Sequence, residues 1–322
     1  MTPHFISRLP RVARSDILIA MPLHLPPLTR RAFLRRSIAA GAGLLTFPAL
    51  RAAESDADPD LWALLSDTHI AADRAAINRD VNMTDHLEAA VLGVRALPSR
   101  PAGVFVNGDC ALLKGLAEDY ATFSSLITPL RKLPIHLTLG NHDDREIFWT
   151  SLKNARPAAP PLASRHVSIV GAARANWFLL DSLDQVNKTP GTLGDEQRDW
   201  LAKALDAHTA KPALVMVHHN PVSSAPGKTP GLTDTEELLA ILLPRRNVKA
   251  LFFGHTHTWR FAEQDGLHLV NLPAVAYPFA ATEVTGWVDA KLSEKGAALT
   301  LHAHDTQHAA HGKITEIAWR AA

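Results

Sequence analysis

The chain has 322 residues, of which 47% are hydrophobic, and this is enough for one large domain or two modest ones. The formal net charge is +1 but uneven: residues 1–52 hold eight basic residues and one acidic residue, which leaves 25 basic and 31 acidic residues beyond them. An acidic body argues against general nucleic-acid binding, and a single cysteine, Cys110, excludes an intrachain disulfide.

Residues 1–52 are typical of an export signal rather than of a folded segment. The twin-arginine motif TRRAFL (29–34) precedes a short apolar stretch (37–50), and small residues suitable for cleavage follow. The stretch is too short to span a bilayer as a mature helix, and a basic amphipathic helix is the less favoured alternative. We expect Met21 to be the true start. We also expect a periplasmic or secreted domain of residues 53–322, exported folded by the twin-arginine machinery and without a membrane anchor.

Apolar runs and helical periodicity alternate along the rest of the chain. Buried strands are predicted at 61–67, 103–109, 135–141, 166–171, 176–182, 213–219 and 248–255. Helices are predicted at 84–97, 117–133, 194–208 and 234–243, the first of them capped by Thr84. After residue 258, two hairpins are predicted around Asp265-Gly266 and Lys295-Gly296. The sequence therefore indicates an α/β domain that ends in antiparallel strands.

Five of the predicted strands end in residues whose side chains bind metals, namely Asp67, Asp109, Asn141, His219 and His255. One such residue at a strand end is usually a turn former or a helix cap. Ligands of α/β sheets, however, bind just outside the carboxyl ends of the strands. Five such side chains at one edge therefore point to a metal site.

The residues around these strand ends form five motifs in a fixed order. They are Asp67-Thr68-His69, Gly108-Asp109, Gly140-Asn141-His142-Asp143, His219-Asn220-Pro221 and Gly254-His255-Thr256-His257. With these motifs the chain resembles the calcineurin-like metallophosphoesterase superfamily across residues 61–257. The stretch GTLGDEQRDWLAKAL (191–205) is similar to its bacterial cyclic-nucleotide-phosphodiesterase-like branch. The resemblance implies a four-layer α/β/β/α sandwich with mixed sheets and two metal ions at the strand ends.

The residue types suit such a site on their own. Mixed carboxylate and imidazole ligands favour Mn, Fe, Zn or Co over Mg or Ca, and one carboxylate can bridge two cations about 3.5–4 Å apart. The resemblance implies one metal held by Asp67, His69 and His257, a second held by Asn141, His219 and His255, and Asp109 as the bridge. The His-x-Pro spacing of the family, counted back from Pro221, selects His219. His218 is the alternative, although as the neighbouring strand residue it would point to the opposite face.

His142 is left without a metal in this arrangement. We expect it to stabilise charge on the phosphoryl oxygens or to protonate the leaving group, with a metal-bridging water or hydroxide as the nucleophile. Asp143 either orients His142 or caps the helix that follows, and we favour the cap. The predicted activity is therefore dinuclear-metal-dependent hydrolysis of a small-molecule phosphodiester or phosphomonoester.

Two sequence features distinguish the chain from related classes of phosphatase. Leu112 stands where purple acid phosphatases carry a tyrosine, and GDCALLKGL lacks the arginine motif of protein Ser/Thr phosphatases. The alternatives are a metal-dependent nuclease, disfavoured by the acidic body, and a non-catalytic metal-binding scaffold, disfavoured by the complete ligand set. The loop 223–234 is either a substrate rim or an ordinary surface connection. We expect core positions for Cys110, Trp177, Trp200 and Trp287, and no further metal site at His302, His304, His308 and His311.

Overall fold

The computed structural model describes residues 57–156, 159–221 and 231–321. The export signal predicted for residues 1–52 and most of the loop 223–234 lie outside the described residues. Within the described part of the chain, no helix combines the length and the apolar character that crossing a bilayer requires.

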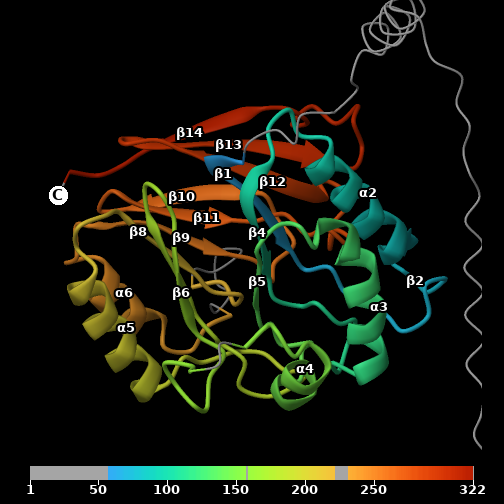
Figure 1. Ribbon diagram of the computed structural model, residues 1–322, viewed down its shortest axis with the longest axis horizontal. Helices are drawn as coiled ribbons and strands as arrows, with labels where there is room; N and C mark the ends of the chain where they lie inside the picture. The colour runs from blue at the N-terminus through green and yellow to red at the C-terminus, as the bar shows by residue number, and fades with distance from the viewer. Residues whose placement is uncertain (1–56, 157–158, 222–230, 322) are drawn as a thin grey trace, which may run out of the picture. The chain divides into compact units, whose positions relative to one another are not determined.

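Two six-stranded mixed sheets form the centre of the described fold (Figure 1). The first sheet has the order β14 (Ile314–Ala318), β13 (Gly296–Ala303), β12 (Gly286–Leu292), β1 (Asp58–Ser66), β4 (Pro101–Asn107) and β5 (Ile135–Thr138). The second has the order β10 (Arg260–Gln264), β11 (Leu267–Asn271), β9 (Val248–Phe253), β8 (Ala213–Met216), β7 (Asn176–Leu179) and β6 (Ser168–Gly171). Strands β1, β4 and β5 are parallel, as are β11, β9, β8 and β7. The carboxyl ends of each parallel group therefore meet at one edge.

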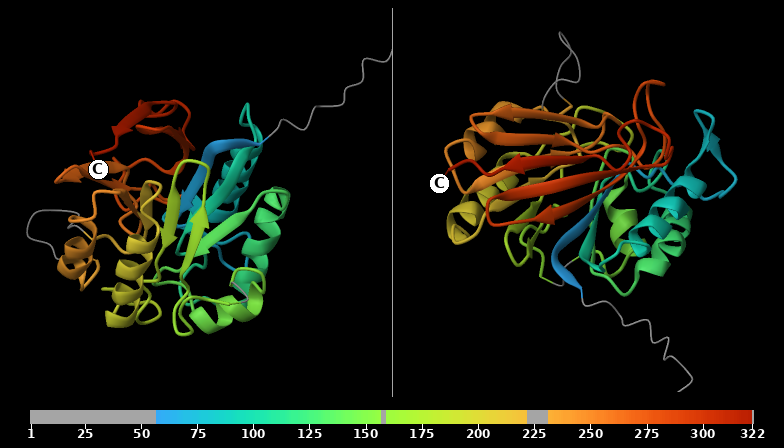
Figure 2. Two further views of the ribbon diagram at one scale, coloured as in Figure 1. Left: turned by 60° about the vertical axis from the view of Figure 1, so that its left-hand side comes forward. Right: turned by 90° about the horizontal axis from the view of Figure 1, so that it is seen from above.

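Helices cover the outer face of each sheet. On the first sheet lie α2 (Met83–Arg95), α3 (Ala117–Ile127), the 3-10 turn η1 (Thr128–Leu130) and α4 (Arg145–Ser151). On the second lie α5 (Asp195–Ala207) and α6 (Thr235–Leu242). Figure 2 shows both sheets between these two groups of helices. The expected α/β/β/α sandwich with mixed sheets is therefore confirmed.

Strand β1 shows why the predicted strands are continuous apolar runs. Ala63 and Leu65 pack under the helices of the first sheet, whereas Trp62 and Leu64 pack between the two sheets. Because both faces of the sheet are covered, both sets of side chains must be apolar. Cys110, Trp177 and Trp287 are buried as expected, and Trp200 is partly buried against the second group of helices.

Two predicted helix caps are wrong by one or two residues. Helix α2 is capped by Asn82, whose side chain accepts hydrogen bonds from the backbone N–H groups of Thr84 and Asp85. Helix α4 is capped by Asp144, which accepts from the N–H of Ile147 at 3.0 Å. In each case a side chain just upstream satisfies the first free N–H groups of the helix. Asp143 is therefore free for another role.

Candidate metal centre

The candidate site lies where strand ends from both sheets come together. Strands β1, β4 and β5 of the first sheet and β8 and β9 of the second run into the loops that carry the five motifs. Positive φ angles, between 46° and 69°, occur in these loops at Asp67, His69, Asp109, His255 and His257. Non-glycine residues rarely adopt this conformation, which costs about 1–3 kcal/mol and is concentrated at functional sites.

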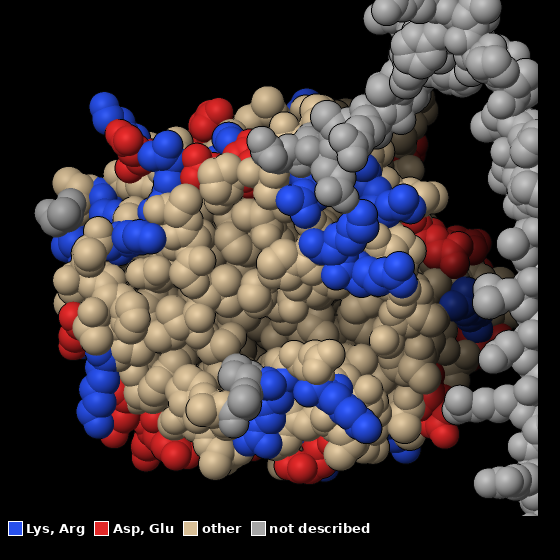
Figure 3. Space-filling model, in the orientation of Figure 1, with Lys and Arg blue, Asp and Glu red and all other residues tan. Residues whose placement is uncertain are grey.

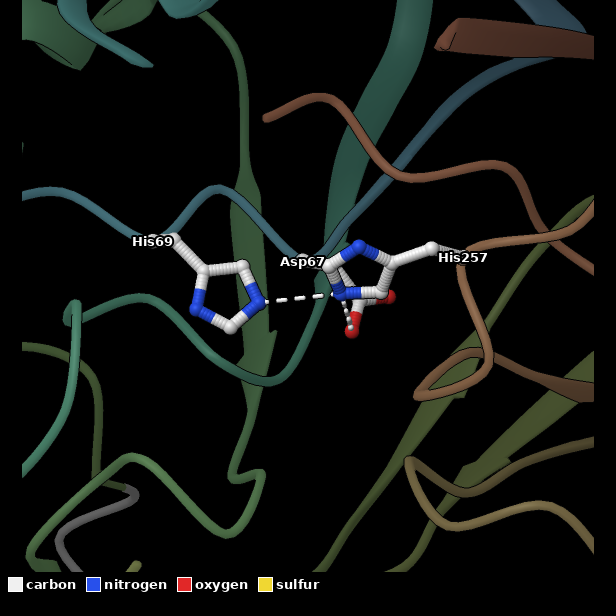
Figure 4. A group of neighbouring side chains, drawn as sticks. All are labelled: Asp67, His69 and His257. Atoms are coloured by element: carbon white, nitrogen blue, oxygen red, sulfur yellow. Dashed lines mark hydrogen bonds and ion pairs between the residues drawn. The ribbon is translucent and has the colours of Figure 1, made fainter. Parts of the chain in front are cut away.

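One group of ligand atoms consists of Asp67, His69 and His257 (Figure 4). The Nε2 atoms of His69 and His257 lie 3.0 Å apart, and the Nε2 of His257 lies 3.4 Å from Oδ1 of Asp67. On the far side of its ring, the Nδ1 of His257 donates to the carbonyl of Tyr277 at 2.6 Å. That bond leaves Nε2 as the lone-pair nitrogen, which is the form that binds a metal.

A second group joins Asp109, His218 and His255, whose ligand atoms all lie within 4.8 Å of one another. The Nε2 of His218 is 3.3 Å from Oδ2 of Asp109 and 3.9 Å from Oδ1 of Asp67. Its Nδ1 is 2.9 Å from the backbone oxygen of Asn107, at the end of β4. His218 is thus drawn toward the first sheet and into the cluster.

The structure groups His218, the alternative ligand, with the other ligand atoms rather than His219, which the sequence favoured. The Nδ1 of His219 lies 2.8 Å from the hydroxyl of Ser182, next to the end of β7, and His219 belongs to neither group of ligand atoms. Strand β8 ends at Met216, so the alternation of a regular strand does not extend to these two residues. Their hydrogen-bond partners, one from each sheet, decide where the rings point.

Asp109 connects the two groups. Its Oδ2 lies 3.6 Å from Nε2 of His69 and 3.3 Å from Nε2 of His218, while its Oδ1 accepts from the backbone N–H of His142 at 2.8 Å. Asn141 follows β5 and is buried, and its Oδ1 has no hydrogen-bond partner among the described residues. The same is true of Nε2 of His218 and of Nε2 of His219. Buried polar atoms without partners are costly, so these residues fit metal ions, which would satisfy them.

The electrostatics agree with a cation at this position. Burial raises the pKa values of Asp67 and Asp109, but the neighbouring histidines, His218 foremost, together outweigh burial and hold both pKa values below the usual range. Burial lowers the pKa of His218, yet the two carboxylates raise it to about 10. Burial lowers the pKa of His69 to about 3 and that of His255 to about 4. Two buried carboxylates and two neutral imidazoles are the protonation states that metal binding requires.

His142 lies at the border of this cluster and is half buried. Its Nδ1 is 3.0 Å from the carbonyl oxygen of Leu113, and its ring lies 5.1 Å from that of His69. One of its ring nitrogens lies within 4.8 Å of ligand atoms of His69 and Asp109. The structure therefore brings His142 to the site together with the predicted metal ligands.

Asp143 neither caps a helix nor orients His142. Its carboxylate accepts hydrogen bonds from the N–H groups of Cys110, Ala111 and Gly140 and from the hydroxyl of Tyr120. Burial, together with the nearby Asp109, raises its pKa to about 6. Asp143 thus ties the loop after β4 to the loop after β5.

Sequence reasoning missed the groups that orient the ligands. Ser182 lies just beyond β7, and a polar residue at that strand end was a usable signal. Tyr277 lies in an irregular segment after β11 and had no periodic or motif signal. Two of the late histidines have partners of their own: His302 pairs with Asp289 at 2.6 Å, and the ring of His304 stacks on that of His86 at 4.1 Å.

Comparison with known proteins identifies the family. Residues 63–259 match the family model described as calcineurin-like phosphoesterase. This chain belongs to that family. It is accordingly a metal-dependent phosphoester hydrolase, and the family binds divalent metals at clusters of the kind described above.

Relatives and solved structures agree with this assignment. The chain is 29% identical over 224 residues to the 3′,5′-cyclic adenosine monophosphate phosphodiesterase CpdA of Pseudomonas aeruginosa, covering 68% of this chain and 78% of that protein. It is 27% identical over 223 residues to the glycerophosphodiester phosphodiesterase GpdQ of Enterobacter lignolyticus, covering 67% and 78%. A dimetal phosphatase from Danio rerio has the same fold, with 16% identity, a TM-score of 0.64, and coverage of 81% of this chain and 99% of that one.

Proposed function

We propose that this phosphoesterase hydrolyses a small-molecule phosphodiester with two transition-metal ions bound at the strand-end cluster. The main support is geometric: two groups of buried ligand atoms lie on either side of Asp109, whose Oδ2 is 3.6 Å from His69 and 3.3 Å from His218. The relatives CpdA and GpdQ are both phosphodiesterases, which favours a diester over a monoester as the substrate.

In this proposal each metal has its own set of ligands. Asp67, His69 and His257 would hold one ion, Asn141, His218 and His255 would hold the other, and Asp109 would contact both. The mixture of carboxylate, amide and imidazole suits Mn, Fe, Zn or Co. When bound, two such ions polarise the phosphoryl oxygens and lower the pKa of a coordinated water toward neutrality.

His142 is the proposed catalytic residue of the chain. Its Nδ1 is engaged by the carbonyl of Leu113, so its Nε2 is the nitrogen available to the substrate. A proton on Nε2 would stabilise negative charge on a phosphoryl oxygen or pass to the leaving oxygen. Protonation at both nitrogens is compatible with this arrangement, because Nδ1 can donate to the carbonyl.

The distribution of charge also bears on the choice between a small substrate and a nucleic acid. Figure 3 shows the Lys and Arg side chains of one face in separate groups near its border, with uncharged side chains between them. A nuclease would need a continuous basic track for the phosphate backbone, and the excess of 31 acidic over 25 basic residues beyond residue 52 disfavours one. No observation favours the nuclease or the scaffold over the phosphodiesterase.

The test is metal analysis combined with hydrolysis of bis-p-nitrophenyl phosphate and p-nitrophenyl phosphate, for wild type and Asp109→Ala. We expect about two metal ions per wild-type chain, faster hydrolysis of the diester, and loss of both metal and activity in the variant. Asp206→Asn is the matched control, because this surface carboxylate pairs with Arg245 at 2.8 Å, outside the cluster. Absence of metal, or full activity in Asp109→Ala, would contradict the proposal.

We further propose that the domain works in the periplasm or outside the cell, after folded export by the twin-arginine machinery. The support is the TRRAFL motif, the apolar stretch behind it and the small residues that follow. The catalytic domain would then comprise residues 53–322.

A further inference from the structure

An aromatic pair extends the metal cluster toward solvent. Tyr277 and Phe279 lie in the segment between β11 and β12. The ring of Tyr277 lies 5.0 Å from that of His69, and the ring of Phe279 stacks on His257 at 4.0 Å with an interplanar angle of 11°. Tyr277 is buried, whereas Phe279 is 50% exposed. One face of Phe279 is therefore fixed against a metal ligand, and the rest of its ring borders the open site.

Arg79 lies over this pair. Its Cζ is 5.0 Å from the ring centroid of Phe279 and 5.8 Å from that of Tyr277. Since His257 occupies one face of Phe279, the guanidinium lies over the other. The order from the metal cluster outward is thus His257, Phe279, Arg79, with contacts of 4.0 and 5.0 Å.

The backbone holds Arg79 in this position. Strands β2 (Ile77–Asn78) and β3 (Val81–Asn82) form an antiparallel hairpin in which Asn78 pairs with Val81. The two residues between them, Arg79 and Asp80, have φ angles of 50° and 64°. Two positive φ angles are the mark of a tight two-residue turn, whose geometry is restricted. The hairpin therefore presents Arg79 at a defined place beside the site.

The charge of Arg79 is not matched by a neighbouring acid. In the ranges that the structure describes, no carboxylate lies within ion-pair distance of its guanidinium, and the residue is exposed. A cation–π contact at an exposed site is weak and transfers no charge, so the rings position the guanidinium without neutralising it. An exposed guanidinium without an ion-pair partner is suited to bind a carboxylate or a phosphate, with which it forms two parallel hydrogen bonds.

We propose that Arg79 is a specificity-determining residue, which binds an anionic group on the substrate arm remote from the scissile phosphate. The ring of Phe279 lies between Arg79 and His257, so the guanidinium lies farther from this metal ligand than Phe279 does. An ester arm that leaves the metals past the half-exposed Phe279 reaches Arg79 with its far end. The anionic group is a carboxylate or a second phosphate. This inference rests on the proposed phosphoesterase site.

The test uses pairs of substrates that differ by one anionic group. The p-nitrophenyl ester of thymidine 5′-phosphate is compared with the same ester carrying a 3′-phosphate, and phenyl phosphate with 4-carboxyphenyl phosphate. We expect wild type to prefer the anionic member of at least one pair, and that pair identifies phosphate or carboxylate as the group bound. In Arg79→Gln this preference in kcat/KM should fall about two- to fivefold, as for loss of a solvent-screened ion pair. The loss should appear mainly in KM, because the contact is remote from the reacting atoms.

Two further variants test whether the preference depends on the guanidinium group and on its position at residue 79. Arg79→Lys keeps the charge but not the planar fork and should retain part of the preference. Arg74→Gln removes an exposed arginine of the same loop, whose guanidinium lies 3.6 Å from Glu88, and should leave the preference intact. Raising the ionic strength should weaken the preference of wild type.

Each other outcome counts against the inference. Equal hydrolysis of both members of each pair by wild type, or an unchanged preference in Arg79→Gln, would overturn it while leaving the phosphoesterase intact. An equal loss in Arg74→Gln would assign the effect to overall charge and overturn it too. Hydrolysis of no substrate by wild type would contradict the proposed function itself, and this inference with it.

Discussion

The imidazoles of the metal centre are oriented by the atoms that their Nδ1 nitrogens contact. His218 and His257 face backbone carbonyls, those of Asn107 and Tyr277, at 2.9 and 2.6 Å. A carbonyl only accepts, so Nδ1 must carry a proton, and in the neutral form of each ring the lone pair is therefore on Nε2. His219 faces the hydroxyl of Ser182 instead, and a hydroxyl accepts either tautomer. The two neighbouring histidines are thus unequal as metal ligands.

At this scale we predict different effects for the two histidines. His218→Ala should lower the metal content from about two ions to about one and reduce kcat at least 100-fold, as for loss of an essential electrostatic group. His219→Ala should keep both metals, because its ring belongs to neither group of ligand atoms. Metal analysis and steady-state kinetics measure both effects, with the surface residue His208→Ala as the control. A larger loss of metal in His219→Ala than in His218→Ala would show that His219, and not His218, is the ligand.

At the scale of the element, the strand ends can approach one another only where the residues that follow them are small. A Cβ atom on Gly254, just after β9, would lie 2.5 Å from Oδ2 of Asp67 at the end of β1. A Cβ on Gly108, after β4, would lie 2.5 Å from Nδ1 of His218, and Gly108 also has a φ of 72°. Glycine at these positions lets loops from both sheets approach within contact distance. The motif glycines are therefore part of the site geometry.

We accordingly predict that Gly254→Ala displaces Asp67 or the end of β9. The cost of such overpacking is about 1–3 kcal/mol, which for a domain of this size lowers Tm by several degrees, and the metal held by Asp67 should be lost. Gly171→Ala in β6 is the matched control, since its Cβ would meet nothing closer than Oδ1 of Asn176 at 3.8 Å. Thermal unfolding and metal analysis of both variants test this. Full metal content in Gly254→Ala would show that the loops can rearrange.

At the scale of the whole molecule, the site exists only when both sheets are in place. Asp67, His69 and Asp109 follow strands of the first sheet, whereas His218 and His255 follow strands of the second. The layer between the sheets, which includes the Phe105–Trp177 contact at 4.7 Å, sets their separation. Metal binding of this kind therefore requires the folded domain. A route that exports folded proteins lets the metals be bound before export.

The prediction at this scale concerns Arg30 and Arg31, which lie outside the described residues. Replacing both with lysine should keep the full-length chain in the cytoplasm, because the export machinery reads the arginine pair. Cell fractionation and the mass of the exported protein measure this. The matched control changes Arg35 and Arg36, the second basic pair, to lysine, and should be exported like wild type. Normal export of the Arg30/Arg31 variant would exclude the twin-arginine route.

Much of the molecule is determined by local signals in the sequence. The apolar runs predict the strands because both sheet faces are buried, and the Asp265-Gly266 hairpin follows from turn chemistry, with φ angles of 49° and 75°. The metal-type residues could be predicted because they stand at strand ends in a recognisable order.

Only the tertiary structure decided the contacts between distant segments. His218 rather than His219 enters the cluster because Asn107 and Ser182 belong to different sheets. Asp143 binds N–H groups from two loops, and Arg79 meets Phe279 across 200 residues of chain. Strand periodicity and turn chemistry depend on neighbouring residues, whereas hydrogen bonds and ring contacts depend on which segments packing brings together. The sequence alone therefore predicts the metal centre, and the fold determines how its side chains are oriented and what borders it.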